Sequence, residues 1–171
     1  MKDKEKLKEL FMQILKFGIV GGLSFVIDFI ITMLVDLVLR KAGLDITITN
    51  GLNSCFSANL MSDAVSAAIG SVFGFCISLI FNYIMSMKFV FERKDDMDRK
   101  KEFAIFAILS LFGLLLNTAI MYGGKILAAQ LMPVFANENK SVVTAGVKMV
   151  ATGIVMVYNF ISRKLTLEKK N

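Results

Sequence analysis

The chain has 171 residues, of which 56% are hydrophobic, and its formal net charge is +6. This apolar share exceeds that of an average soluble domain, and the length suits no more than one ordinary domain. With no histidine and only two cysteines, the usual metal-ligand clusters and histidine-based acid–base catalysis are excluded. We therefore expect no metal and no cofactor.

The first 16 residues mix lysine with apolar residues at helical spacing. The apolar members are Leu7, Leu10, Phe11, Ile14 and Leu15. The apolar run that follows is longer than the core of a typical signal peptide. The pattern therefore predicts an interfacial amphipathic segment that leads into the first membrane span.

Four apolar runs follow, at roughly 17–39, 64–87, 103–123 and 142–161. Each approaches or exceeds the about 20 residues that cross a hydrocarbon core of about 30 Å. Four such runs leave too little polar surface for a water-soluble fold. The sequence therefore predicts an all-α membrane protein with four transmembrane helices.

The connections between these runs differ in character. The segment 40–63 is polar, and Asn50-Gly51 predicts a turn within it. The segment 125–132 follows two glycines and stops at Pro133, so it either extends the third helix past a bend or lies along the outer interface. The loop 92–102 carries charges of both signs and no catalytic pattern.

The second span has a small residue at every fourth position, and this ridge lets another helix approach closely. Its members are Ser62, Ser66, Gly70, Gly74 and Ser78. Two interpretations remain open. The ridge either packs within the helix bundle or forms a face for self-association into a homo-oligomer.

Basic residues gather in three clusters, and these predict the orientation in the membrane. The clusters are Lys2, Lys4, Lys6, Lys8 and Lys16 before the first span; Lys88, Arg93, Lys94, Arg99, Lys100 and Lys101 between the second and third; and Arg163, Lys164, Lys169 and Lys170 after the fourth. The positive-inside rule places both termini and the central loop in the cytoplasm. This topology explains the positive charge better than nucleic-acid binding does. We therefore expect no nucleic-acid partner.

The two halves of the chain repeat each other. Residues 17–28 correspond to 106–117, and 81–88 correspond to 158–164, where each half has an aromatic–Asn–aromatic sequence followed by basic residues. The sequence thus predicts a single membrane domain over residues 1–171, with parallel two-helix repeats at about 14–91 and about 103–168.

Polar residues inside the spans are the candidate functional groups. An acid at mid-membrane costs roughly 2.5–3.5 kcal/mol on insertion scales, and Asp28 lies about 16 Å into its span. Lys148 lies about 21 Å into the fourth span, which brings it within reach of Asp28. The two either form an internal ion pair or act on a substrate.

Asn82 and Asn159 lie near the inner ends of their spans, each followed by basic residues. One interpretation takes each residue by itself: the two amides form hydrogen bonds across helices, and Lys88, Arg163 and Lys164 anchor the topology. The other interpretation takes the residues as duplicated copies. The amides and basic residues of both halves then form one electropositive site that suits a phosphate or diphosphate headgroup. No histidine, nucleophile elbow or glycine-rich phosphate loop accompanies them, and we therefore predict that the protein is not an enzyme.

Residues 81–91, the shortened copy at 158–167, and the opening Phe17-Gly18-Ile19-Val20-Gly21-Gly22 with Asp28 together resemble GtrA-like membrane proteins. The resemblance covers roughly residues 14–168. One departure is that Leu165 and Leu167 replace the aromatic residues expected after the second basic cluster.

The resemblance implies a multi-pass protein of the cytoplasmic membrane that translocates a polyprenyl-phosphate-linked sugar for cell-surface polysaccharide or teichoic-acid glycosylation. Its partners would be that lipid-linked sugar, a membrane glycosyltransferase and membrane lipids. Lys88, Arg163 and Lys164 would bind the lipid phosphate. The sugar path or polar stripe would include Asp28, Asn82, Asn117, Asn159 and Lys148. The alternatives are a membrane adaptor for a glycosyltransferase and a small proton-coupled transporter in which Asp28 titrates.

Overall fold

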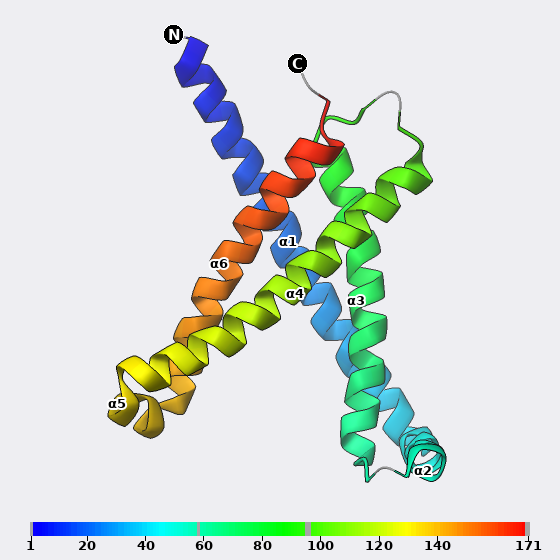
Figure 1. Cartoon of the computed structure of the whole chain (residues 1–171). Helices are drawn as coiled ribbons and strands as arrows, with labels where there is room; N and C mark the ends of the chain where they lie inside the picture. Colours follow the sequence, from blue (N-terminus) through cyan, green and yellow to red (C-terminus); the bar gives the residue numbers. More distant parts are fainter. Residues whose placement is uncertain (1, 58, 95–96, 170–171) are drawn as a thin grey trace. The chain divides into compact units, whose positions relative to one another are not determined.

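The computed structural model describes residues 2–57, 59–94 and 97–169. It contains the helices α1 (Lys2–Lys41), α2 (Leu44–Phe56), α3 (Ser62–Phe89), α4 (Arg99–Leu131), α5 (Pro133–Glu138) and α6 (Lys140–Leu167) (Figure 1). Within the described ranges there is no strand beyond one isolated bridge. The predicted all-α fold is confirmed.

Four helices are long and apolar enough to cross a membrane. They are the segments Lys4–Lys41, Ser62–Phe89, Arg99–Leu131 and Lys140–Leu167. These correspond to the four predicted spans. The chain divides into two compact units, Met1–Val90 and Phe91–Asn171, and each unit holds two of the candidate spans. The repeat relationship between the halves stays a prediction.

In the first unit, α1 continues without a break from the charged N-terminal segment into the first span. Its 40 residues correspond to a length of about 60 Å, about twice the thickness of the hydrocarbon core. One end of α1 therefore extends beyond the core. The amphipathic, interfacial character of the N-terminal segment stays a prediction.

The small-residue ridge of α3 packs against α1. A Cβ atom at Gly70 would lie 2.7 Å from the Thr32 carbonyl oxygen, and one at Gly74 would lie 2.6 Å from the Asp28 carbonyl oxygen. Residue 28 lies opposite 74 and residue 32 lies opposite 70, so the numbering runs in opposite directions along the two helices. Helices α1 and α3 are therefore antiparallel (Figure 1). The missing side chains at Gly70 and Gly74 let the two backbones meet. The ridge thus serves packing within this unit.

The predicted turn at Asn50-Gly51 is wrong, because both residues lie inside α2. The chain reverses instead at Gly43 and Ser57, whose φ angles of 65° and 49° lie in the left-handed region. Helix α2 contacts both α1 and α3. Such tertiary contacts outweigh the local preference of Asn-Gly for a turn.

In the second unit, α4 runs straight through Gly123 and Gly124 to Leu131. The segment 125–132 therefore extends the third span instead of forming a separate interfacial segment. The short helix α5 has Pro133 in its first turn, where the missing N–H of proline costs nothing. It connects α4 to α6, which packs along α4 as its antiparallel neighbour (Figure 1).

Candidate functional site

Polar side chains follow the α1/α3 contact at every fourth position of α1. Asp28, Thr32, Asp36 and Arg40 share one face because residues four apart are neighbours on a helix. The Thr32 hydroxyl donates to the Gly70 carbonyl oxygen at 3.3 Å. We call these four residues the polar seam of the first unit.

Asp28 is the deepest acid of the polar seam. Its side chain is half-buried, and its Oδ1 atom lies against the Cβ position of Gly74, at 2.6 Å. This oxygen is buried and has no hydrogen-bond partner among the described residues. A buried acceptor without a donor costs about 1–3 kcal/mol. The Asp28 carboxylate therefore has an oxygen that could accept a hydrogen bond but receives none within the first unit.

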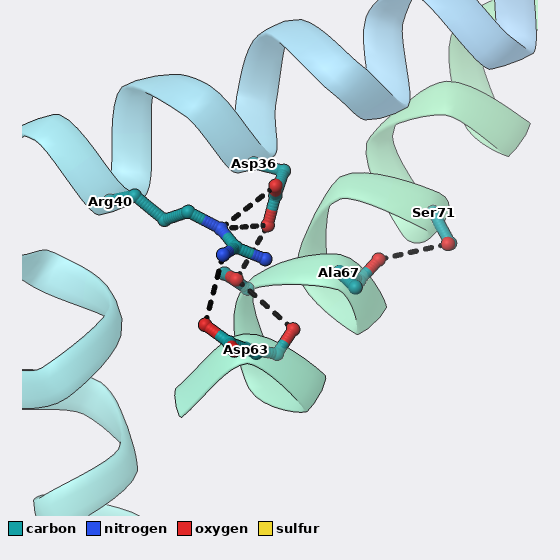
Figure 2. Close-up of polar contacts among 6 residues, drawn as sticks. Asp36, Arg40, Asp63, Ala67 and Ser71 are labelled. Atoms are coloured by element: carbon teal, nitrogen blue, oxygen red, sulfur yellow. Dashed lines mark hydrogen bonds and ion pairs between the residues drawn. The ribbon is translucent and has the colours of Figure 1, made fainter. Parts of the chain in front are cut away.

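The end of the polar seam near α2 is closed by a cluster of Asp36, Arg40, Asp63 and Ser66. Figure 2 labels the first three of these residues. The Arg40 guanidinium lies 2.9 Å from Asp36 Oδ2 and 2.9 Å from Asp63 Oδ1. The Ser66 hydroxyl donates to Asp36 Oδ1 at 2.5 Å. The cluster thus ties the end of α1 to the start of α3. The cluster was not predicted from the sequence, although the spacing of Asp36 and Arg40 is that of a helical ion pair.

The predicted site residues of α3 lie in different surroundings. Asn82 is half-buried, and its Oδ1 accepts a hydrogen bond from the fully buried Ser86 hydroxyl at 3.1 Å. Lys88 is exposed, and its Nζ lies 5.2 Å from the centroid of the Phe89 ring. Asn82 therefore has a structural partner within its own helix, whereas the Lys88 ammonium remains accessible to an anion.

Arg163, the central basic residue of the second unit, is only 4% exposed. Its Nη2 donates to the Ser110 hydroxyl at 2.8 Å, and its Cζ lies 3.8 Å from the centroid of the Phe106 ring. Phe106 is itself fully buried. The guanidinium therefore stacks on an aromatic ring between α4 and α6, an arrangement stabilised by cation–π attraction.

The remaining polar residues predicted in the second unit are not drawn together. Asn159 contacts the Cβ position of Gly113, with its Oδ1 at 2.8 Å. Asn117 is half-buried, and Lys148 is exposed. Since Lys148 and Asp28 belong to separate units, their pairing stays a prediction.

Residues 91–94, which precede α4, pair with residues 166–169 at the end of α6. We call this pairing the terminal clamp. The Lys94 ammonium donates to the Thr166 carbonyl oxygen at 2.7 Å, and the Lys169 N–H donates to the Glu92 carbonyl oxygen at 2.9 Å. Phe91 packs on Phe160 with ring centroids 6.0 Å apart. The clamp was not predicted from the sequence.

Charged side chains surround the terminal clamp. Lys164 Nζ lies 2.6 Å from Glu168 Oε2. Arg93 Nε lies 3.5 Å from Oε1 of Glu102, whose side chain is 2% exposed. Lys164 is partly exposed, unlike Arg163 beside it. Of the three predicted phosphate-binding residues, Lys88 and Lys164 are therefore the accessible ones.

The described residues contain no group of three or more His, Cys, Asp or Glu side chains that could hold a metal ion. The chemistry on offer is hydrogen bonding and charge. Along the polar seam, carboxylates can accept hydrogen bonds from the hydroxyl groups of a ligand, and hydroxyls can both donate and accept them. Lysines at the helix ends can attract a phosphate.

A comparison with protein families matched the chain to the GtrA/DPMS transmembrane domain over residues 16–167. The matched residues include the apolar cores of all four candidate spans. Neither the curated proteins nor the solved structures compared with the chain gave a match.

Proposed function

Because the chain belongs to the GtrA/DPMS transmembrane-domain family, we propose that this multi-pass membrane protein translocates a polyprenyl-phosphate-linked sugar across the cytoplasmic membrane. The sugar would serve cell-surface polysaccharide or teichoic-acid glycosylation. In this proposal both termini lie in the cytoplasm and the protein performs no chemical step. A membrane glycosyltransferase on the cytoplasmic side would supply the lipid-linked sugar.

The polar seam of the first unit is the observation that carries the proposal. Its residues recur at each turn of an otherwise apolar span, where a charged side chain is costly and tends to be functional. Asp28 Oδ1 lacks a hydrogen-bond donor among the described residues. A sugar hydroxyl would reach this buried oxygen when α1 and α3 part at Gly74. It would then supply the missing donor and offset part of the cost of burying the oxygen.

The lipid phosphate would be held by lysines at the ends of the spans. Lys88 is exposed and Lys164 partly exposed, and an ammonium group binds phosphate as a point charge. Arg163 would act indirectly, because its contacts with Phe106 and Ser110 fix α6 against α4. The polyprenyl tail would remain in the surrounding lipid.

A translocation assay with purified protein in vesicles and one defined polyprenyl-phosphate sugar tests the proposal. We expect Asp28→Asn and Lys88→Ala each to slow translocation at least about tenfold, equivalent to about 1.4 kcal/mol. Glu9→Gln and Lys8→Ala are matched controls, because both residues lie on exposed positions of α1 before its apolar run at 17–39. Unchanged translocation in both test variants would show the mechanism to be wrong.

The adaptor function is a second candidate, and the tight packing within each helix pair favours it. Gly74 is in contact with Asp28, and Arg163 is engaged by Ser110 and Phe106, as expected if polar groups only hold helices together. In cells, an unrelated membrane anchor fused to the glycosyltransferase would then restore glycosylation without this protein. Failure of such a fusion supports translocation instead.

A further inference from the structure

Three sides of helix α2 differ in chemistry, and the remaining side carries the exposed Ile46 and the half-buried Asn53. The first of the three sides is buried and polar. Asp45 is 6% exposed and Thr49 is 4% exposed. They lie four residues apart and so share one side of the helix. Since α2 contacts both α1 and α3, this polar side faces the protein.

The second side of α2 is polar and exposed. It consists of Thr47, Asn50, Gly51 and Ser54. Their spacing of three, one and three residues places them on the side of the helix away from Asp45 and Thr49. These side chains are suited to contact with water.

The third side of α2 is an apolar stripe of Leu44, Ile48, Leu52 and Cys55, with Phe56 at the end of the helix. The spacing of four, four and three residues forms a continuous row along the helix. Leu44 and Cys55 are exposed, Ile48 and Leu52 are half-buried, and Phe56 is 76% exposed. We call this row the apolar stripe of α2.

This arrangement differs from that of a surface helix in a water-soluble protein, which turns its apolar side to the core. In α2 the core-facing position is taken by Asp45 and Thr49, and the apolar stripe remains partly exposed. Water is a poor solvent for that stripe. The stripe therefore needs an apolar phase outside the unit.

The connections of α2 keep it near the membrane surface. Its 13 residues correspond to about 20 Å, too short to cross a hydrocarbon core of about 30 Å. Its ends lie close in sequence to the ends of two candidate spans, at Lys41 and Ser62. The left-handed turns at Gly43 and Ser57 redirect the chain at each end.

From this geometry we propose that α2 is an interfacial helix. Its apolar stripe lies in the acyl-chain boundary of the membrane, the side with Thr47 and Ser54 faces water, and the side with Asp45 faces the protein. The helix thereby fixes the depth of the adjoining ends of α1 and α3. Lipid is favoured as the occupant because α2 connects two spans and its stripe has no charged residue.

Nitroxide labels on adjacent residues of α2 provide the test. In a Cys76→Ala background, the label is placed on the native Cys55. The matched control carries Ser54→Cys together with Cys55→Ser and Cys76→Ala. In lipid vesicles, we expect the label at position 55 to be more accessible to oxygen than to a water-soluble nickel chelate, and the label at position 54 to show the opposite.

Two results would overturn the proposal. Preference of both labels for the nickel chelate would place α2 in water. Shielding of the label at position 55 from both reagents would mean that a protein, such as a second copy, covers the stripe. If a label at position 54 or 55 disturbs the fold, the same comparison is made with labels on Thr47→Cys and Leu44→Cys in a background of Cys55→Ser and Cys76→Ala.

Discussion

Arg163 is a charged residue whose role depends on its burial between two helices. Its guanidinium is held by the Ser110 hydroxyl and the Phe106 ring, contacts that are worth about 1–3 kcal/mol in buried sites. We expect Arg163→Gln to lower the unfolding free energy by that amount. Lys164→Gln should lower it by about 0–1 kcal/mol, because its pair with Glu168 is partly exposed. Reversible unfolding in mixed micelles, followed by circular dichroism, measures both.

Two further variants separate packing from charge at this position. Arg163→Lys keeps the charge but loses the planar stack on Phe106, so it should restore little of the lost stability. A double-mutant cycle with Ser110→Ala should give a coupling energy well above zero. Equal stability of Arg163→Gln and the native protein would contradict the structural role.

The sequence identified Arg163 as important for its charge but did not reveal its burial. A basic residue near the end of a span usually reaches toward the headgroups, and that general rule predicted an accessible side chain. The structure places Phe106 and Ser110 opposite it, one turn apart on α4. These neighbours come from a helix more than 50 residues away in sequence, so no local pattern indicates them.

At the scale of elements, the contact of α1 with α3 depends on Gly74. A Cβ atom there would lie 2.6 Å from the Asp28 carbonyl oxygen, so α1 and α3 would have to separate locally to admit it. We expect Gly74→Ala to destabilise the protein by about 1–3 kcal/mol. The melting temperature in detergent should fall accordingly.

Gly22→Ala is the matched control, because nothing lies within 4 Å of the Cβ position of Gly22. Alanine favours a helix over glycine by about 0.8–1.0 kcal/mol, so this variant should be as stable as the native protein or more so. Similar melting temperatures for Gly74→Ala and the native protein would show that α1 and α3 do not meet at this position.

The sequence predicted the four long helices but not the short helix α2. The four long apolar runs identified α1, α3, α4 and α6 because the transfer of each segment into a membrane depends mainly on its own composition. Helix α2 was missed, since Asn50-Gly51 has a strong local preference for turns. That preference is outweighed by the contacts of α2 with α1 and α3.

At the scale of the whole molecule, the distribution of basic residues predicts an orientation that fusions can test. A fluorescent protein at the C-terminus or inserted after Asp98 should fluoresce, because both positions are predicted to be cytoplasmic. Alkaline phosphatase fused after Asn50 or Asn139 should be active, because it folds only after export. Green fluorescence in intact cells and phosphatase activity measure the two outcomes.

Reciprocal fusions serve as controls for this topology. Alkaline phosphatase after Asp98 and a fluorescent protein after Asn50 should both be inactive. Phosphatase activity after Asp98 would place the central loop outside and reverse the predicted direction of translocation. The orientation of all four spans would then have to be reassigned.

The number of candidate spans, the membrane class and the family could be read from residue order, because hydropathy and motif order are properties of each segment alone. The same reading identified Asp28 as the costly group within the first span. The contacts of Gly74 with Asp28, the burial of Arg163 on Phe106 and the burial of Asp45 in α2 became visible only in the folded structure. These features depend on which faces of the helices pack together. The packing contacts join residues that are far apart in the chain, so no local pattern reveals them.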